Sequence, residues 1–297
     1  MEFFQPSSWS EALEVKADHP EATPIAGGTD VMVELNLDHR RPASIVDLTR
    51  VRELTEWGME DGRLRIGAAV TYTRLIDELG DRLPGLAMAS RTVGSPQIRN
   101  RGTVGGNLGT SSPAGDAHPP LLASDAQVEV ASKSGTRRIP IREFFTGPKK
   151  NAMHEDELIA AFLVEPAPGA QQFSKVGTRN AMVIAVCSFA LALDPARRRV
   201  GTGIGSAGPT PLRAAEAEQF IEGVLDEENL WDRRTPVSES ALTRFGQLVA
   251  MAARPIDDVR GTAAYRRHAL AVLARRCFAW AWSSPSMGRR RGAPEGP

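Results

Sequence analysis

The alternation of apolar and polar residues predicts short strands and helices that follow one another through the first half of the chain. Apolar positions at helical spacing predict helices over residues 8–19, 31–35, 71–79 and 86–92. Short apolar or alternating runs predict strands over residues 23–26, 44–48, 64–67, 126–131, 136–141 and 158–164. Ser8 or Ser10 is positioned to cap the first helix. Residues 94–113 are rich in Gly, Ser, Pro and Asn, which predicts a long functional loop.

The second half has a different pattern. Residues 166–169 read Pro-Ala-Pro-Gly, which predicts a linker and a domain boundary near residue 170. Strands are predicted over residues 173–177, 183–193 and 199–205, and helices over residues 212–224, 239–253 and 262–282. This order predicts an α+β unit with antiparallel strands and helices packed on one face. The Gly-, Pro- and Arg-rich tail over residues 283–297 is expected to be disordered.

The composition is that of an ordinary globular protein and restricts its chemistry. The 297 residues are 41% hydrophobic, and the 36 Lys and Arg balance the 36 Asp and Glu, so nothing indicates nucleic-acid binding or an anionic membrane surface. We find no signal peptide or membrane span and expect a cytoplasmic protein. The cysteines are Cys187 and Cys277, too few for an iron–sulfur cluster with about four cysteine ligands. Redox chemistry would therefore use an organic cofactor or a partner's metal.

Two glycine-rich segments are the strongest chemical signal. The first reads Ala26-Gly27-Gly28-Thr29-Asp30, and the second reads Thr103-Val104-Gly105-Gly106-Asn107. Backbone amides in such turns can hold a phosphate, so two of them suggest the pyrophosphate of a dinucleotide. Each segment could instead simply join a strand to a helix. Asp116 could accept a hydrogen bond from a ribose or ribityl hydroxyl, or cap the helix that follows it.

Other motifs are absent or fail in their context. Residues 203–208 match G-x-G-x-x-G, but Pro209 and Pro211 follow where a Rossmann helix would begin, so we expect a glycine-rich strand end or turn. We find neither a P-loop nor a G-x-S-x-G elbow. The histidines are scattered without the spacing of metal ligands, at His19, His39, His118, His154 and His268.

Several motifs together resemble one family. The glycine segments are accompanied by Ser112-Pro113-x-x-Asp116, and further matching stretches cover residues 97–102, 173–179, 207–213 and 257–267. In this order they resemble the FAD-binding medium subunit of the molybdenum hydroxylases, the family of xanthine dehydrogenase and aerobic carbon monoxide dehydrogenase. The resemblance covers nearly the whole chain and ends at about residue 283.

The resemblance implies an α+β fold in two parts. An FAD-binding domain of the vanillyl-alcohol-oxidase (PCMH) type would occupy residues 1–170, with subdomains over 1–58 and 59–170. A C-terminal α+β domain with a three-stranded antiparallel sheet would occupy residues 171–282. The residues that would wrap the FAD pyrophosphate are Ile25, Ala26, Gly27, Gly28, Thr29, Asp30, Val31, Met32, Thr103, Val104, Gly105, Gly106 and Asn107. Asp116 would bind a cofactor hydroxyl. Val93, Ile159 and Lys175 would lie near the isoalloxazine ring or its approach. Val93 stands where some members of the family have an aromatic residue.

The same resemblance implies an electron-transfer role. A partner subunit with molybdopterin would oxidise a xanthine, aldehyde, carbon monoxide or N-heterocycle substrate. Electrons would pass through [2Fe-2S] clusters of a small subunit to FAD in this chain, and on to NAD⁺, a quinone or O₂. A dimer of heterotrimers is the expected assembly. The alternatives are a stand-alone flavin oxidase, which often carries a covalently attached flavin, and a flavin-free assembly subunit.

Overall fold

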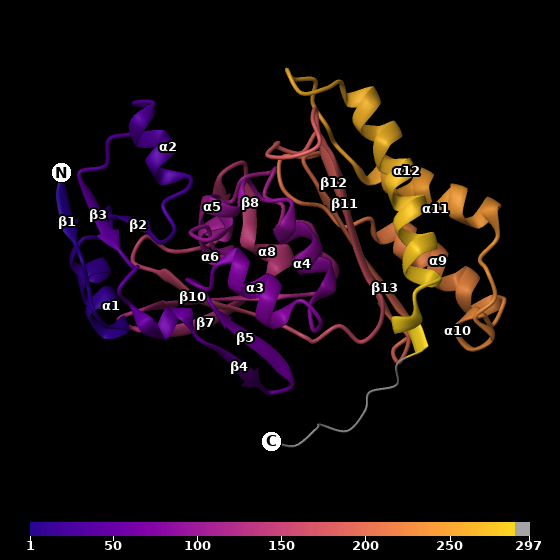
Figure 1. Ribbon diagram of the computed structural model, residues 1–297, viewed down its shortest axis with the longest axis horizontal. Coiled ribbons are helices and arrows are strands. Elements are labelled where there is room, and N and C mark those ends of the chain that lie inside the picture. The colour runs from indigo at the N-terminus through magenta and orange to yellow at the C-terminus, as the bar shows by residue number, and fades with distance from the viewer. Residues whose placement is uncertain (289–297) are drawn as a thin grey trace.

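The computed structural model describes residues 1–288 and contains three main sheets that follow one another along the molecule (Figure 1). The first sheet is parallel, in the order β1-β3-β2. Its strands and adjoining helices are β1 (Glu2–Phe4), α1 (Trp9–Asp18), β2 (Thr23–Ile25), α2 (Val31–Asn36), β3 (Ser44–Asp47) and the 3₁₀ helix η1 (Arg52–Thr55). Of the two predicted caps, Ser8 is the one that caps α1, by accepting a hydrogen bond from the Glu11 amide.

The second sheet is antiparallel and five-stranded, in the order β4-β5-β10-β6-β7. Its strands are β4 (Trp57–Glu60), β5 (Arg63–Gly67), β6 (Gln127–Ser132), β7 (Gly135–Pro140) and β10 (Leu158–Val164). The segments between them form α3 (Tyr72–Leu79), α4 (Pro84–Arg91), α5 (Pro96–Arg99), α6 (Val104–Thr110), α7 (His118–Ala123), α8 (Ile141–Phe144) and the small hairpin of β8 (Phe145–Gly147) and β9 (Lys150–Asn151). The central strand β10 is buried along its whole length, which fits its continuous apolar run.

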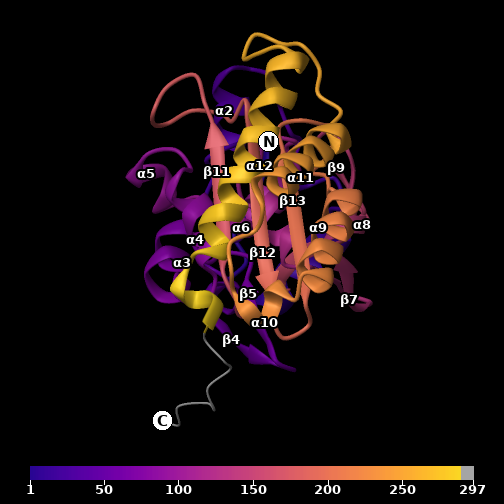
Figure 2. The same cartoon turned by 90° about the vertical axis from the view of Figure 1, so that its right-hand side faces the viewer.

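The third sheet is the predicted antiparallel sheet, in the order β11-β12-β13. Its elements are β11 (Gln171–Val176), β12 (Cys187–Asp194), β13 (Arg199–Gly205), α9 (Ala215–Glu227), α10 (Leu230–Arg233), α11 (Glu239–Ala252), α12 (Ala263–Trp282) and the 3₁₀ helix η2 (Pro285–Gly288). Helices α9, α11 and α12 cover the outer face of the sheet (Figures 1 and 2). Phe245 joins the layers, because its ring contacts both Phe189 of β12, at 6.3 Å between centroids, and Phe278 of α12, at 5.3 Å.

The inner face of the third sheet packs on α7 through glycines. A Cβ at Gly201 would lie 2.0 Å from the Ala123 carbonyl oxygen, and a Cβ at Gly203 would lie 2.0 Å from that of Pro119. Only glycine allows a helix backbone to lie this close to a strand. The G-x-G-x-x-G match is therefore a glycine-rich strand end, as expected, and its first glycine permits the packing of the third sheet on α7.

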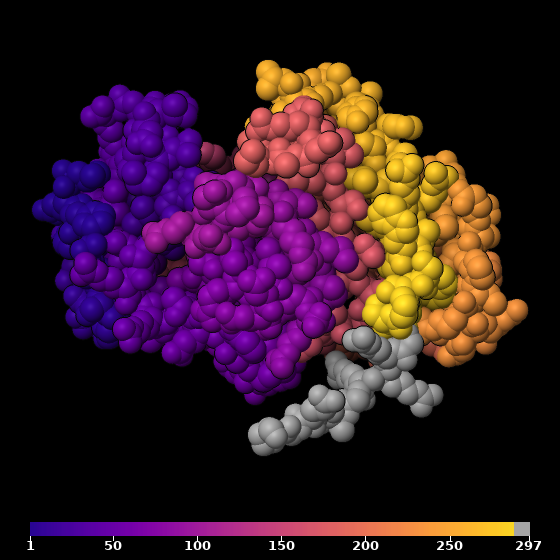
Figure 3. Space-filling view, viewed as in Figure 1, coloured from indigo at the N-terminus to yellow at the C-terminus, as the bar shows by residue number. Residues whose placement is uncertain are grey.

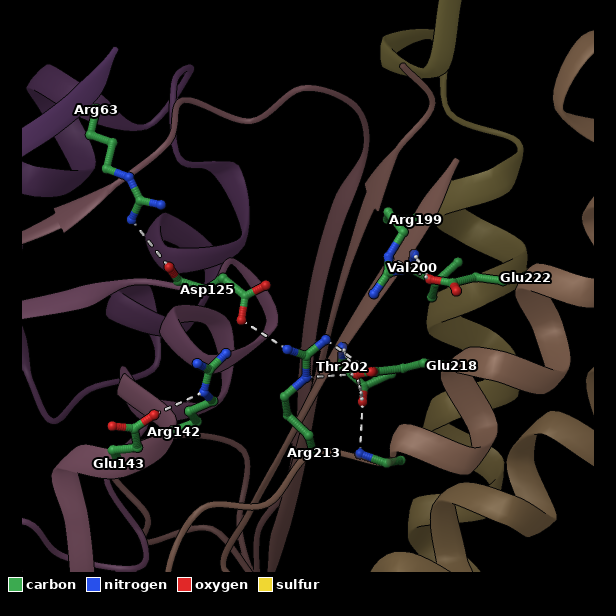
Figure 4. Close-up of polar contacts among 11 residues, drawn as sticks. Arg63, Asp125, Arg142, Glu143, Arg199, Val200, Thr202, Arg213, Glu218 and Glu222 are labelled. Carbon is green, nitrogen blue, oxygen red and sulfur yellow. Dashed lines mark hydrogen bonds and ion pairs between the residues drawn. The ribbon is translucent and has the colours of Figure 1, made fainter. Parts of the chain in front are cut away.

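A polar network continues this contact (Figure 4). Arg213 places Nη1 2.8 Å from Asp125 Oδ1, on the side of the second sheet, and Nη2 2.9 Å from Glu218 Oε2 of α9. The buried Glu218 also accepts hydrogen bonds from the amide of Thr202, at 2.8 Å, and from its hydroxyl, at 2.6 Å. The amide of Val200 donates to Glu222 at 2.7 Å. Carboxylates of α9 thus occupy amides at the outer edge of β13, which leaves that edge unavailable to another strand.

Several predicted elements are wrong in detail. Residues 94–113 are not one loop, because Ser95 and Thr103 cap the helices α5 and α6 with their side chains. The strand predicted from residue 183 begins only at Cys187, so a loop of residues 177–186 precedes β12. The start of the predicted tail forms η2, where Met287 is 5% exposed in the core of the third unit. The rest of that tail, residues 289–297, lies outside the described residues.

Candidate functional site

A cavity of about 930 Å³ lies between the first sheet and the second. In Figure 3 a furrow separates the indigo and violet N-terminal part from the purple and magenta part that follows it. Both glycine segments line the cavity. Of the predicted site residues, those that line it are Ala26, Gly27, Gly28, Thr29, Asp30, Val31, Val93, Thr103, Gly105, Gly106, Asn107, Asp116 and Ile159. The predicted residues outside this lining are Ile25, Met32, Val104 and Lys175.

The first glycine segment packs directly on the chain that leads to the second. A Cβ at Gly27 would lie 2.0 Å from the Arg101 carbonyl oxygen, so this position requires glycine because of the protein itself. Gly28 has a φ of +76°, a left-handed conformation that starts the turn into α2. The Thr110 hydroxyl donates to Asp30 Oδ2 at 2.9 Å and ties the start of α2 to the end of α6. The two segments thus form a single wall of the cavity.

The second glycine segment is the first turn of α6 and not a free turn. The Thr103 hydroxyl caps this helix by accepting from the Gly106 amide at 2.8 Å. A Cβ at Gly105 would lie 2.4 Å from the Ala68 carbonyl oxygen, so Gly105 allows α6 to pack on its neighbour. A Cβ at Gly106 would meet only the Thr103 hydroxyl, at 3.1 Å, and Gly106 borders the cavity. The first turn of a helix carries amides without intrahelical acceptors, which suits an anionic ligand.

Asp116 does not cap α7 but forms an ion pair with Lys175. Residue 117 occupies the N-cap position, and no side chain caps the helix. The Lys175 ammonium lies 2.6 Å from Asp116 Oδ2 and also donates to the carbonyls of Thr92, at 3.0 Å, and Val183, at 3.2 Å. Burial raises the pKa of Asp116, and the charge and hydrogen bond of Lys175 oppose this rise. Lys175 therefore stands behind the cavity wall and connects β11 to the second sheet's helices and to the loop of residues 177–186.

Three buried polar atoms at the cavity have no hydrogen-bond partner among the described residues. They are Asp116 Oδ1, Asn107 Oδ1 and the Tyr72 hydroxyl, and all three residues line the cavity. A buried polar atom without a partner is costly and rare, so these atoms indicate a polar ligand. Two acceptors and one hydroxyl suit a ligand that carries hydroxyl groups. The sequence pattern treated Tyr72 as part of an ordinary helix and gave no signal for this role.

The cavity is apolar where Val93 and Ile159 lie. Met182, Val183 and Ile184 from the loop of residues 177–186 line the same cavity. Side chains from the segment after α4, from β10 and from the third unit thus give this cavity apolar lining, which suits a flat apolar ring. The sequence reasoning missed this loop because it assigned residues from 183 onward to a strand.

Within residues 1–288, we find no group of three His, Cys, Asp or Glu side chains arranged to hold a metal ion. Burial raises the pKa of the Cys187 thiol to about 12 and that of Cys277 to about 11, so both thiols stay protonated and unreactive. Across this same range, no helix is both long enough and apolar enough to cross a membrane.

Comparison with known families assigns the class. Residues 1–166 match the family described as the FAD binding domain in molybdopterin dehydrogenase, and residues 172–281 match the CO dehydrogenase flavoprotein C-terminal domain. These matches and the fold define an FAD-binding subunit of an oxidoreductase. The chain belongs to the molybdenum hydroxylase family, as its FAD-binding medium subunit; molybdopterin and [2Fe-2S] clusters belong to the partner subunits in this family.

Individual relatives agree with this assignment. The chain is 33% identical over 284 residues to the xanthine dehydrogenase FAD-binding subunit of Escherichia coli O157:H7, covering 92% of this chain and 93% of the relative. It is 33% identical over 235 residues to the nicotinate dehydrogenase FAD-subunit of Eubacterium barkeri, covering 75% and 79%. Among solved structures, a carbon monoxide dehydrogenase chain from Oligotropha carboxidovorans matches with a TM-score of 0.86 and 26% identity, covering 95% of this chain and 97% of that one.

Proposed function

We propose that this chain binds one FAD in the cavity between its first and second sheets and acts there as an electron-transfer subunit. The observation that carries the proposal is the unpartnered, buried Oδ1 of Asp116, because Asp116 lines a cavity that both glycine segments also line. Val93, Ile159 and residues 182–184 give the same cavity an apolar lining, which suits a flavin ring. All the predicted residues named above remain the proposed FAD-binding set, with Lys175 acting through Asp116.

The residues of this chain supply position and environment. Thr103 caps α6 at Gly106, and Thr110 at the end of α6 donates to Asp30 at the start of α2. The two glycine segments are therefore held together at one cavity. Lys175 favours the ionised form of Asp116, because its ammonium lies 2.6 Å from the carboxylate and opposes the rise in pKa that burial causes. FAD, when bound, supplies the ability to accept electrons singly and release them as a pair.

The proposed assembly places the other redox centres on other chains. A large molybdenum subunit would oxidise the substrate, and a small subunit with [2Fe-2S] clusters would pass the electrons to this chain in a dimer of heterotrimers in the cytoplasm. We propose NAD⁺ as the acceptor, with a quinone or O₂ as the other acceptors to test. The two buried cysteines of this chain support this division, because they are too few to hold a cluster.

The proposal is tested by the absorbance and activity of the purified protein. The chain would be produced alone and together with its co-purifying partners, and each sample would be assayed with purines, aldehydes and N-heterocycles. We expect the absorbance spectrum of the chain to show flavin bands. We expect substrate-dependent reduction of NAD⁺ only with the complex. A chain without flavin in both samples would contradict FAD binding. Rapid oxidation of a small substrate by the chain alone with O₂ would contradict the subunit role.

A further inference from the structure

We propose that Tyr72 is a cofactor-binding residue whose hydroxyl donates a hydrogen bond to a hydroxyl oxygen of the bound cofactor. This inference rests on the proposed FAD site and adds a residue that neither the glycine segments nor the family motifs indicate. It assigns a specific donor to the part of the cavity where Asp116 supplies an acceptor.

The tyrosine ring is held in place beside the second glycine segment. Tyr72 is the first residue of α3, follows the N-cap Thr71, and is 3% exposed. Its amide donates to the Gly102 carbonyl at 3.0 Å, and a Cβ at Gly102 would lie 3.3 Å from the ring. Thr71 and Thr103 form a β-bridge directly beside this contact. The ring is therefore packed between fixed backbone segments and cannot turn its hydroxyl elsewhere without moving them.

The hydroxyl itself has no partner in residues 1–288, although it is buried and its residue lines the cavity. A tyrosine hydroxyl can donate and accept, and one that is buried usually finds a partner. Phenylalanine would fill the same space without this desolvated group. The hydroxyl thus costs stability in the empty site and is explained by a group that occupies the cavity.

The charges around Tyr72 determine which kind of group that is. Burial raises the pKa of Tyr72 well above its usual value, and the negative charges of Asp116 and Asp30 raise it further. The hydroxyl therefore stays protonated as a donor. Asp116 Oδ1 is an unpartnered acceptor, and the Asp116 carboxylate acts electrostatically on Tyr72. A ligand hydroxyl can donate to a carboxylate such as Asp116 and accept from a tyrosine hydroxyl such as that of Tyr72.

The test compares Tyr72→Phe with Tyr265→Phe, which alters the chain's other tyrosine on an exposed part of α12. FAD would be removed from the full chain and titrated back while flavin fluorescence is followed, and the unfolding midpoint of each FAD-free chain would be measured in urea. We expect FAD to bind about 10-fold more weakly to Tyr72→Phe, with unchanged affinity for Tyr265→Phe. The FAD-free Tyr72→Phe chain should be as stable as wild type or more stable, because the variant removes an unpaired buried hydroxyl.

The outcomes separate this inference from the proposed function. Wild-type affinity of Tyr72→Phe for FAD would overturn the hydrogen bond but leave the FAD site intact. A weaker affinity that is matched by a lower stability of the FAD-free chain would assign Tyr72 a merely structural role and also overturn the inference. A wild-type chain that binds no FAD would instead refute the proposed function on which the inference rests.

Discussion

Replacing Lys175 by methionine tests whether the buried ion pair with Asp116 holds the site together. The two side chains are 9% and 10% exposed, and the ammonium has three acceptors within 3.2 Å. Methionine keeps an unbranched chain but leaves the Asp116 carboxylate buried without its counter-charge. Removal of one partner of a buried pair costs about 3–5 kcal/mol, so we expect Lys175→Met to lower the free energy of unfolding by about this amount.

The matched variant is the double substitution Lys175→Met with Asp116→Leu. Replacing both members of a buried ion pair by apolar residues often changes the free energy of unfolding very little, because neither charge then has to be desolvated. We expect the double variant to recover most of the stability that Lys175→Met loses. The assay is urea unfolding of the FAD-free full chain, followed by tryptophan fluorescence and circular dichroism. A decrease in the free energy of unfolding of less than about 1 kcal/mol in Lys175→Met would refute the role of the buried pair, because exposed ion pairs contribute that little to stability.

The pH dependence of Lys175→Met gives a second check on the same pair. Burial already raises the pKa of Asp116, and removal of Lys175 takes away the charge that opposes this rise. A carboxyl group whose pKa is raised in the folded state binds protons more readily there than in the unfolded state. Its unfavourable contribution to stability therefore grows as the pH rises from its pKa in the unfolded state through its pKa in the folded state. The stability deficit of Lys175→Met should therefore shrink as the pH is lowered. An equal deficit at every pH would contradict this account.

Three further changes test other parts of the structure. Gly203→Ala places a Cβ 2.0 Å from the Pro119 carbonyl oxygen, so we expect urea unfolding to show a free energy of unfolding that is lower by about 3 kcal/mol or more. The control is Gly58→Ala, where the Cβ would meet nothing and we expect no change. Gly106→Val should leave the FAD-free chain folded but reduce FAD binding at least 10-fold, because Gly106 lines the cavity and a valine there keeps a ligand from approaching the backbone; unchanged affinity in a fluorescence titration would contradict the placement of α6. Burial lowers the pKa of His118 to about 4, so wild-type stability should fall by up to about 3 kcal/mol as the pH drops from 6.5 to 4, and His118→Gln should lack this part of the acid sensitivity.

The sequence predicted the main elements of the fold because their signals are local. An apolar run marked β10, two serines marked the start of α1, and the prolines after Gly208 excluded a Rossmann helix. The antiparallel third sheet was confirmed in the same way. In each case a pattern of neighbours along the chain was enough to determine the element.

The errors came from elements whose causes lie elsewhere in the molecule. Helix α6 contains glycines that discourage helix in isolation, but Gly105 is required by the Ala68 backbone that packs on it. Helix α7 begins with His118 and two prolines, which are tolerated in a first turn, and it is stabilised by burial against β13. No local pattern announces such long-range contacts.

The site also contains some features that the sequence signals locally and others that it does not. The glycine segments and Asp116 were identified by their residue types, and the structure brings them to one cavity. The pairing of Asp116 with Lys175 joins residues 59 positions apart, and the role of Tyr72 depends on the absence of a partner for its hydroxyl among the described residues. Neither feature has a signature in the sequence, because each arises only when the sheets are packed together.

The central claim is that this cavity holds one FAD, and the most direct measurement is the amount of FAD per chain. Purified wild-type protein and Gly106→Val would each be saturated with FAD, separated from free flavin, and denatured to release the bound cofactor for quantification by absorbance. The account predicts about one FAD per wild-type chain and a marked loss in the variant, with both chains folded by circular dichroism. A full complement of FAD in Gly106→Val, or none in the wild type, would contradict it.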